Sequence, residues 1–212
     1  MKVEIWSDVV CPFCYVGKRR FENALSEFEH RDGVEVIWRS FELDANAPTE
    51  SEGSLDDMLA KKYGMDLEQA KVMNARVTQM AADEGLGFRL EEAKRGNTFD
   101  AHRLIHLAAA HGLRAEAKER LLRAYFTEGK PIGSRETLIE LAAELGLDRQ
   151  EAGTVLGSDA YAAEVRADEQ RAAELHVNGV PFFVFDGRYG VSGAQETETF
   201  AQVLRKAWDE AR

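Results

Sequence analysis

Residues 2–28 read KVEIWSDVVCPFCYVGKRRFENALSEF, and the change of periodicity within this stretch decides the fold. At its start, the apolar residues Val3 and Ile5 alternate with the charged residues Lys2 and Glu4, which predicts a short strand. From Pro12 onward the apolar side chains recur at helical spacing, so we expect a helix that ends near Gly33, where glycine supplies the stop. The helical stripe consists of Phe21, Ala24, Leu25 and Phe28.

Two further stretches have the character of strands. Side chains alternate again from Val34 to about Leu43, which completes a strand-helix-strand unit. Near the C-terminus, residues 180–185 form an apolar run, and Asp186-Gly187 after it is a hairpin signal that predicts a returning strand over residues 188–191. A closing helix is indicated by Phe200, Val203, Leu204 and Ala207.

The middle of the chain has helical periodicity only. Four helices are marked by Met73, Val77 and Met80, by Ala101, Leu104, Ile105 and Ala108, by Leu121, Leu122, Tyr125 and Phe126, and by Leu138, Leu141, Ala142 and Leu145. We therefore expect an α/β fold with a large all-helical insertion. The expected boundaries are 1–50 for the first part of the α/β domain, 51–176 for the insertion and 177–212 for the second part.

Composition limits the classes of function. The chain has 212 residues, with 27 Lys and Arg against 38 Asp and Glu, so its net charge is −11. This balance argues against nucleic acid as a partner, because phosphate binding needs concentrated positive charge. No apolar run approaches the length of about 20 residues that a membrane span needs. The N-terminus carries Lys2 and Glu4 where a secretion signal needs apolar residues, so we expect a cytoplasmic protein with no membrane partner.

The chain has 2 cysteines, Cys11 and Cys14, at the junction of the first strand and the first helix. A helix N-terminus offers unpaired N–H groups and the positive end of the helix dipole, so we expect a lowered pKa and a thiolate at Cys11. Pro12 fits the first helical turn, where its missing N–H costs nothing. Cys14 lies one turn further, close enough to form a disulfide with Cys11. The pair therefore predicts an attacking and a resolving thiol.

Two other interpretations of the cysteines compete with this one. Half of a zinc site is the first, but zinc needs further ligands, and the sequence offers only His102 and His106 at i, i+4 spacing. Two unrelated core cysteines are the second. The placement between a strand and a helix favours a redox pair over both, and we expect no metal.

Four segments together resemble a known family. They are residues 8–17 (DVVCPFCYVG), 96–103 (GNTFDAHR), 179–183 (GVPFF) and 192–195 (SGAQ). In this order they resemble the DsbA family of thioredoxin-fold oxidoreductases, and within it the FrnE-like branch. That branch is related to 2-hydroxychromene-2-carboxylate isomerase and to the kappa-class glutathione transferases. The resemblance covers essentially the whole chain.

The resemblance implies a thioredoxin fold interrupted by a helical domain, with a cis Pro181 facing the cysteines. It also implies that Val180 offers its backbone N–H and C=O to an extended substrate chain, which is binding by strand addition. The expected activity is that of a dithiol–disulfide oxidoreductase or isomerase. The expected partners are thiol- or disulfide-containing proteins or small thiols. No cofactor beyond the redox-active disulfide is expected, with glutathione as a candidate thiol partner.

Phe13 is a departure from the best-known periplasmic members of that family, which have histidine there. Without an imidazole donor beside the thiolate, we expect a less acidic Cys11 and a weaker oxidant. Potentials in this superfamily run from about −270 mV to about −120 mV, so one dipeptide can reverse the direction of net electron flow. Phe13 is also a candidate apolar contact for a bound peptide, along with Pro12. Alternatively, the Phe13 ring only shields the two sulfurs from solvent, and the sequence favours neither role.

Two other functions remain open from the sequence. A glutathione-dependent isomerase or transferase would use Ser192-Gly193-Ala194-Gln195, before the last helix, as an anion site. The intact cysteine pair argues against it, because such reactions need no resolving thiol. A chaperone-like module that shelters unfolded chains near Phe13 and Phe182 is the other. The sequence predicts no oligomeric state.

Overall fold

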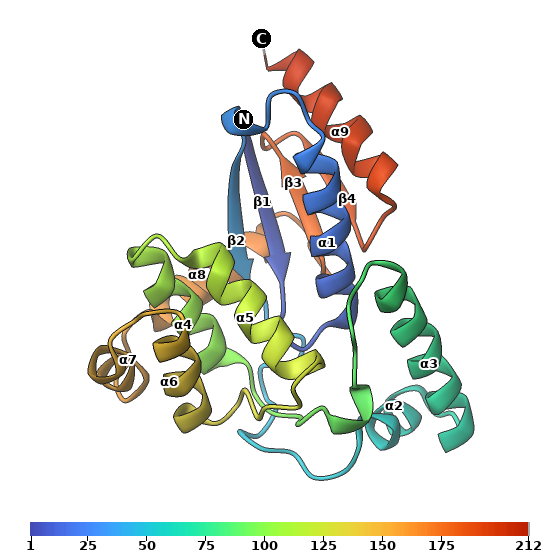
Figure 1. Cartoon of the computed structure of the whole chain (residues 1–212), viewed down its shortest axis with the longest axis vertical. Helices are drawn as coiled ribbons and strands as arrows, with labels where there is room; N and C mark the ends of the chain where they lie inside the picture. The colour runs from blue at the N-terminus through green and yellow to red at the C-terminus, as the bar shows by residue number, and fades with distance from the viewer. Residues whose placement is uncertain (212) are drawn as a thin grey trace. The chain divides into compact units, whose positions relative to one another are not determined.

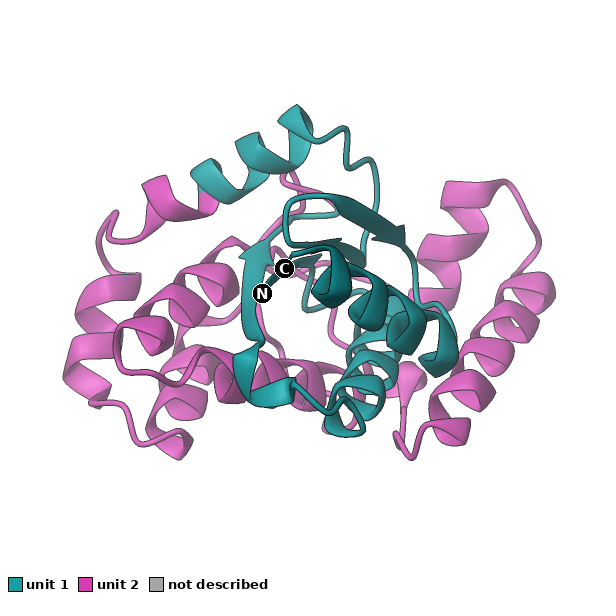
Figure 2. Ribbon diagram, turned by 90° about the horizontal axis from the view of Figure 1, so that it is seen from above, with its two compact units in different colours: residues 1–43, 166–212 teal, residues 44–165 magenta. Residues whose placement is uncertain are grey.

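The computed structural model describes residues 1–211, and these form two compact units (Figure 2). Met1–Leu43 and Arg166–Arg212 make up the first, the sheet unit, and Asp44–Val165 make up the second, the helical unit. The insertion therefore begins and ends earlier in the chain than the boundaries expected at residues 50 and 176. The later boundary moves because residues from 166 onward pack on the sheet.

The sheet unit contains one mixed sheet in the order β2-β1-β3-β4 (Figure 1). Its strands are β1 (Lys2–Ser7), β2 (Glu35–Ser40), β3 (Phe182–Phe185) and β4 (Tyr189–Ser192). β1 pairs in parallel with β2 and antiparallel with β3, and β3 pairs antiparallel with β4. The expected strand-helix-strand unit and the terminal hairpin thus belong to the same sheet.

Strand lengths are set by the pairing. β2 stops at Ser40 rather than continuing to Leu43, because its partner β1 ends at Ser7, directly opposite Ser40. The predicted hairpin is confirmed: Asp186 and Gly187 both have positive φ, 51° and 68°. This is the conformation that an Asp-Gly pair adopts with little strain.

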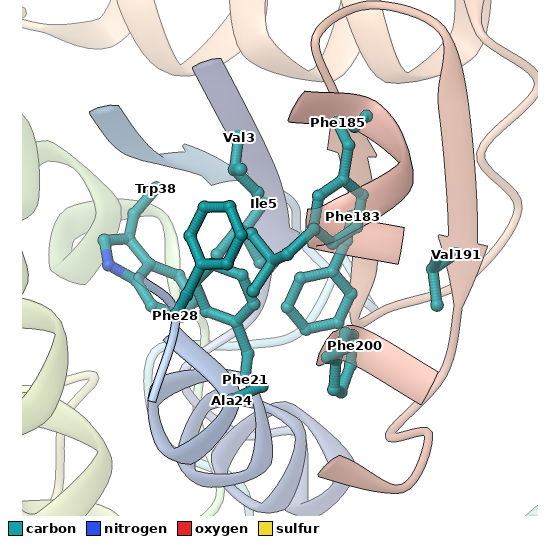
Figure 3. Packing of buried hydrophobic residues seen from close by; sticks show 12 residues of the cluster. Val3, Ile5, Phe21, Ala24, Phe28, Trp38, Phe183, Phe185, Val191 and Phe200 are labelled. Carbon is teal, nitrogen blue, oxygen red and sulfur yellow. The ribbon is translucent and has the colours of Figure 1, made fainter. Parts of the chain in front are cut away.

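One face of the sheet is covered by α1 (Pro12–Ser26) and α9 (Thr197–Glu210), which contact each other. The core between them and the sheet is rich in aromatic rings (Figure 3), and it contains Val3, Ile5, Phe21, Ala24, Phe28, Trp38, Phe183, Phe185, Val191, Phe200, Leu204 and Ala207. The helical stripe and the closing helix predicted from the sequence are both confirmed. The pairing of aromatic rings at centroid distances such as 4.6 Å for Phe183 and Phe200 makes this core dense.

The first helix ends earlier than predicted, at Ser26 rather than near Gly33. After Ser26 the chain turns so that the rings of Phe28 and His30 pack against Trp208 of α9, with centroids 5.9 and 4.7 Å away. A Cβ on Gly33 would come within 2.6 Å of the Trp208 ring. Gly33 is therefore required for close approach to α9, and it is not the helix stop.

The opposite face of the sheet carries a smaller apolar cluster of Trp6, Ala172, Val177 and Val184. Ala172 belongs to α8 (Ala162–Glu174), and the Trp6 indole N–H donates to the Asp168 carbonyl of the same helix at 2.9 Å. The second half of α8 is thus part of the sheet unit. The boundary expected at residue 176 placed all of this helix in the insertion.

The helical unit contains no strand between residues 44 and 165, as the sequence predicted. Its elements are α2 (Leu55–Tyr63), α3 (Leu67–Asp83), η2 (Leu90–Glu92), α4 (Phe99–Ala110), α5 (Arg114–Phe126), α6 (Arg135–Glu144), α7 (Arg149–Leu156) and the start of α8. Turns between them use glycines with positive φ, including Gly112 and Gly146. Over residues 1–211, no helix is long and apolar enough to cross a membrane.

Candidate active site

The two cysteines lie where β1 leads into α1. Cys11 is the N-cap residue of α1, and Pro12 is the first residue of the helix, as the sequence predicted. The backbone N–H of Cys14 donates to the Cys11 carbonyl at 3.0 Å, which closes the first turn. This turn places both thiols on the same end of the helix.

Both cysteines are buried and are not joined by a disulfide in this structure, with Cys11 4% exposed and Cys14 fully enclosed. The hydrogen bond with the Cys14 thiol and then burial raise the pKa of the Cys11 thiol well above its usual range, and the charge of Asp8 adds to this. A backbone hydrogen bond from Cys14 opposes the shift but does not reverse it. The sequence-based expectation of a lowered pKa is therefore wrong for this conformation. The second sulfur and burial raise the pKa of Cys11 by more than the N–H groups at the start of the helix lower it.

Asp8 is the charged group that the sequence analysis left without a role. It is 1% exposed, and its carboxylate accepts the backbone N–H of Val9 at 2.7 Å and that of Leu43 at 2.8 Å. It thereby ties the end of β1 to the segment that follows β2. The sequence signal was an acidic residue directly after a buried strand, three positions before Cys11.

The Val180–Pro181 segment lies against Cys11. The Val180–Pro181 peptide bond is cis, as the family resemblance implied. The Cys11 thiol donates to the Val180 carbonyl at 3.5 Å, and the Pro181 carbonyl accepts the backbone N–H of Gly193 at 2.8 Å. The structure therefore brings together four of the predicted site residues, namely Cys11, Cys14, Val180 and Pro181.

Phe13 differs from the other aromatic residues near the motif. Its side chain is 42% exposed, whereas Trp6 and Tyr15 are buried. Trp6 and Tyr15 are therefore packing residues. The Phe13 ring is available to solvent, and Leu43, whose backbone is held by Asp8, is a second exposed apolar side chain at 44%.

The segment around Asn97 lies in the helical unit. The Asn97 side chain, one position before the N-cap residue Thr98, accepts the backbone N–H of Phe99, the first residue of α4, at 2.8 Å. His102 is 1% exposed and packed inside the unit. Among residues 1–211, no group of three or more His, Cys, Asp or Glu side chains is arranged to hold a metal ion.

The predicted anion site, residues 192–195, lies directly before the start of α9. Glu196 is its N-cap residue, and Glu198 lies in its first turn. The Glu196 carboxylate pairs with Arg20 at 2.8 Å. Negative charge therefore already occupies the end of the helix at which the glutathione-dependent hypothesis requires an anion to bind.

Comparison with known proteins agrees with this geometry. The model of the DSBA-like thioredoxin domain matches residues 2–205. The chain belongs to the DsbA family. Its fold is accordingly the thioredoxin fold with a helical insertion, as the resemblance implied, and proteins of the DsbA family act on thiols or disulfides.

Three proteins are similar to this DsbA-family chain to different degrees. A probable DsbA oxidoreductase from Streptomyces coelicolor is 50% identical, with a TM-score of 0.95 over 99% of this chain and 91% of that one. The uncharacterised protein YwbO of Bacillus subtilis is 28% identical over 95% of this chain and 94% of its own length. A 2-hydroxychromene-2-carboxylate isomerase is 16% identical, with a TM-score of 0.74 over 100% of this chain and 98% of that one, and it shares the fold alone.

Proposed function

We propose that this chain is a thiol–disulfide oxidoreductase that works through a Cys11–Cys14 redox pair. The observation that carries the proposal is the position of the Cys11 thiol. It lies at the start of α1, in hydrogen-bond contact with the Cys14 thiol and with the Val180 carbonyl. An attacking sulfur, a resolving sulfur and a backbone acceptor for substrate thus meet at one point.

In the reducing direction, Cys11 loses its proton and attacks one sulfur of a substrate disulfide. A mixed disulfide forms, and the other substrate sulfur leaves as a thiolate that takes up a proton. Cys14 then loses its proton and attacks Cys11, which releases the second substrate thiol and leaves a Cys11–Cys14 disulfide. Two electrons pass to the substrate, and the reverse sequence oxidises a dithiol.

The substrates we propose are extended protein segments that contain a cysteine. Val180 would pair with such a segment through its backbone, which supplies affinity with little side-chain selectivity. The exposed Phe13 ring offers an apolar contact beside the reacting sulfur. Small thiols would react at the same sulfur without that pairing.

The environment of Cys11 favours a weak oxidant. The Cys14 thiol, burial and Asp8 all disfavour the Cys11 thiolate, and Phe13 supplies no donor to stabilise it. A destabilised thiolate makes the dithiol form less stable relative to the disulfide. We therefore propose a potential closer to the thioredoxin end, about −270 mV, than to the about −120 mV of strong oxidants, and hence reductase or isomerase activity in a cytoplasmic setting.

The proposed reaction needs neither a metal nor a nucleotide. Glutathione enters it as a small thiol that returns the disulfide to the dithiol. The glutathione-dependent isomerase or transferase is less well supported, because Glu196 and Glu198 make the start of α9 acidic. A resolving Cys14 would also have no part in such a reaction.

The first experiment is the equilibrium of the pair in graded glutathione buffers, followed by thiol trapping and mass spectrometry. We expect interconversion of a dithiol and an intramolecular disulfide. A stable Cys11–glutathione adduct, or no disulfide at any ratio, would contradict the two-thiol mechanism.

Two serine variants identify the roles of the sulfurs. Cys14→Ser should trap a mixed disulfide with a peptide substrate, because the resolving thiolate is missing. Cys11→Ser should trap none and should have no turnover. A Cys11→Ser/Cys14→Ser double variant that still suppressed aggregation of an unfolded protein at the wild-type level would support the chaperone-like alternative instead.

A further inference from the structure

The proposed function requires the Val180–Pro181 segment to stay beside Cys11 while a substrate strand pairs with it. We propose that Arg20, on the third turn of α1, is a positioning residue that holds this segment in place through the carbonyl of Ala194. Its role rests on the proposed function, because it acts on the substrate-binding backbone.

The connection runs through a short series of contacts. The Arg20 guanidinium donates to the Ala194 carbonyl at 3.0 Å. Next to Ala194, the backbone N–H of Gly193 donates to the Pro181 carbonyl at 2.8 Å. The carbonyl of Val180, directly before Pro181, accepts a hydrogen bond from the Cys11 thiol at 3.5 Å. The helix that carries the cysteines therefore also holds the loop that supports the segment facing them.

Gly17, one turn before Arg20, brings the same helix face into direct contact with this segment. A Cβ on Gly17 would lie 3.0 Å from the Pro181 ring and 3.4 Å from Ala194. These distances are tighter than ordinary van der Waals contact, so glycine lets α1 approach Pro181 more closely than a residue with a side chain would. Gly17 sets how near the helix approaches, and Arg20 holds the loop at that distance.

Burial indicates which contact of Arg20 matters. Its side chain is 10% exposed, but its ion-pair partner Glu196 is 75% exposed. Exposed ion pairs contribute little, because water and salt screen them. A buried guanidinium that donates to a carbonyl is a charge-assisted hydrogen bond, which is shorter and stronger than a neutral one. The Ala194 carbonyl is therefore the partner through which Arg20 positions the loop.

The test compares two substrates in single-turnover reactions with the reduced protein. One is an extended peptide that carries a disulfide, and the other is 5,5′-dithiobis(2-nitrobenzoate), which needs no strand pairing. In Arg20→Gln we expect the peptide concentration for half-maximal rate to rise about tenfold, equivalent to about 1.4 kcal/mol of binding. The maximal rate and the reaction with the small disulfide should stay near wild type.

Three variants serve as matched controls. Arg19→Gln removes the neighbouring arginine, which is partly exposed and pairs with Glu22, and it should behave as wild type. Glu196→Gln removes the exposed ion pair and keeps the Ala194 contact, so it should also behave as wild type. Arg20→Lys keeps a cationic donor and should recover part of the peptide affinity.

Gly17→Ala tests the segment from the other side without touching Arg20. Alanine favours the helix by about 1 kcal/mol over glycine, so a loss of peptide affinity in this variant cannot come from a weakened helix. We expect its half-saturating peptide concentration to rise as well. If Arg20→Gln does not fold, as judged by circular dichroism, Arg20→Lys takes its place in the comparison of the two disulfides, and wild-type peptide kinetics in that variant would count against the guanidinium contact.

Several results would overturn the role of Arg20. These are wild-type peptide kinetics in Arg20→Gln, equal losses with both disulfides, or the same defect in Glu196→Gln. Failure of the proposed function looks different, because the wild-type protein would then react with neither disulfide through a Cys11–Cys14 intermediate.

Discussion

A buried arginine in the helical unit and two buried carboxylates in the sheet unit bind opposite kinds of backbone group, although the sheet unit also buries the cations Lys18 and Arg20. In the helical unit, the Arg103 guanidinium is 2% exposed. It donates to the backbone carbonyls of Val155, Ser158 and Ala160, at and after the end of α7, with a distance of 2.8 Å to Ala160. In the sheet unit, the most enclosed charges include the carboxylates of Asp8 and Asp168.

These carboxylates accept backbone N–H groups near the ends of strands. Asp8 binds the N–H groups of Val9 and Leu43, and Asp168 binds that of Ser40 at 2.9 Å. The last turn of a helix leaves carbonyls without intrahelical partners, whereas a strand that ends leaves both N–H groups and carbonyls that need other partners. At Arg103, Asp8 and Asp168, the sign of the buried charge thus matches the backbone groups that it binds.

The largest expected effect is on Arg103. Arg103→Met removes the donor from the carbonyls after α7, and we expect the free energy of unfolding to fall by about 3 kcal/mol. Urea denaturation followed by circular dichroism measures this. The redox equilibrium of the Cys11–Cys14 pair should not change, because the substitution lies in the other unit.

Arg135→Gln is the matched control for this comparison. Arg135 pairs with Asp100, as Arg103 does, but its side chain is 58% exposed. We expect a loss below about 1 kcal/mol, because screening weakens an exposed pair. Equal losses in Arg103→Met and Arg135→Gln would show that the backbone carbonyls are not what makes Arg103 important.

The next largest effect on stability is expected at Glu4, a carboxylate of the sheet unit that is bound by arginine side chains. Burial alone raises the pKa of Glu4, but hydrogen bonds from Arg171 and Arg39 outweigh it and leave the pKa below its usual 4.5. A lowered carboxyl pKa stabilises the fold above pH 4.5, and this stabilisation is lost as the pH falls through the folded-state pKa.

Glu4→Gln should therefore lower the free energy of unfolding by about 2 kcal/mol at neutral pH. The difference from wild type should shrink as the pH falls below 4.5, because the wild-type carboxylate then also loses its charge. Urea titrations at a series of pH values measure this. A difference that stayed constant with pH would mean that shape, not charge, is what Glu4 contributes.

The smallest effect is expected at the active site. The Cys14 thiol and burial raise the pKa of Cys11, and the Asp8 carboxylate adds to them. Asp8→Asn removes the charge and keeps a carbonyl oxygen for one N–H group, so the pKa of Cys11 should fall. Alkylation of Cys11 by iodoacetamide should then become severalfold faster at neutral pH, with its pH profile moved to lower pH.

Ser7→Ala is the control for Asp8→Asn, since it changes a buried neighbour on β1 without changing charge. Its alkylation profile should match that of wild type. A profile that moved equally in both variants would assign the effect to loosened packing around the strand end. A profile that moved to higher pH in Asp8→Asn would contradict the sign of the electrostatic argument.

Much of the fold could be predicted from sequence because its signals are local. Val3 and Ile5 lie in the core under α1, and Asp186-Gly187 turns the hairpin. Local patterns failed where long-range packing decided the outcome. α1 stops at Ser26 because Phe28 turns onto Trp208, a residue 180 positions later in the chain.

The candidate site shows the same division. Cys11 at the N-cap followed by Pro12 is a local feature, and it was predicted. Asp8 and Arg20 are charged residues that sequence patterns assign to the surface, and in Lys18-Arg19-Arg20 nothing marks that the first and third side chains are buried and the second is partly exposed. Arg20 acquires its role only because the chain returns 174 residues later and places Ala194 against it.

By itself, therefore, the sequence determined the order of strands and helices, the helical insertion and the position of two cysteines at a helix start. These depend on periodicity, turn residues and spacing, which act over a few residues. The tertiary structure alone decided the acidity of Cys11, the place of Val180 beside it and the partners of Asp8. Burial and electrostatics depend on which distant segments surround a group, so no short stretch of sequence contains that information.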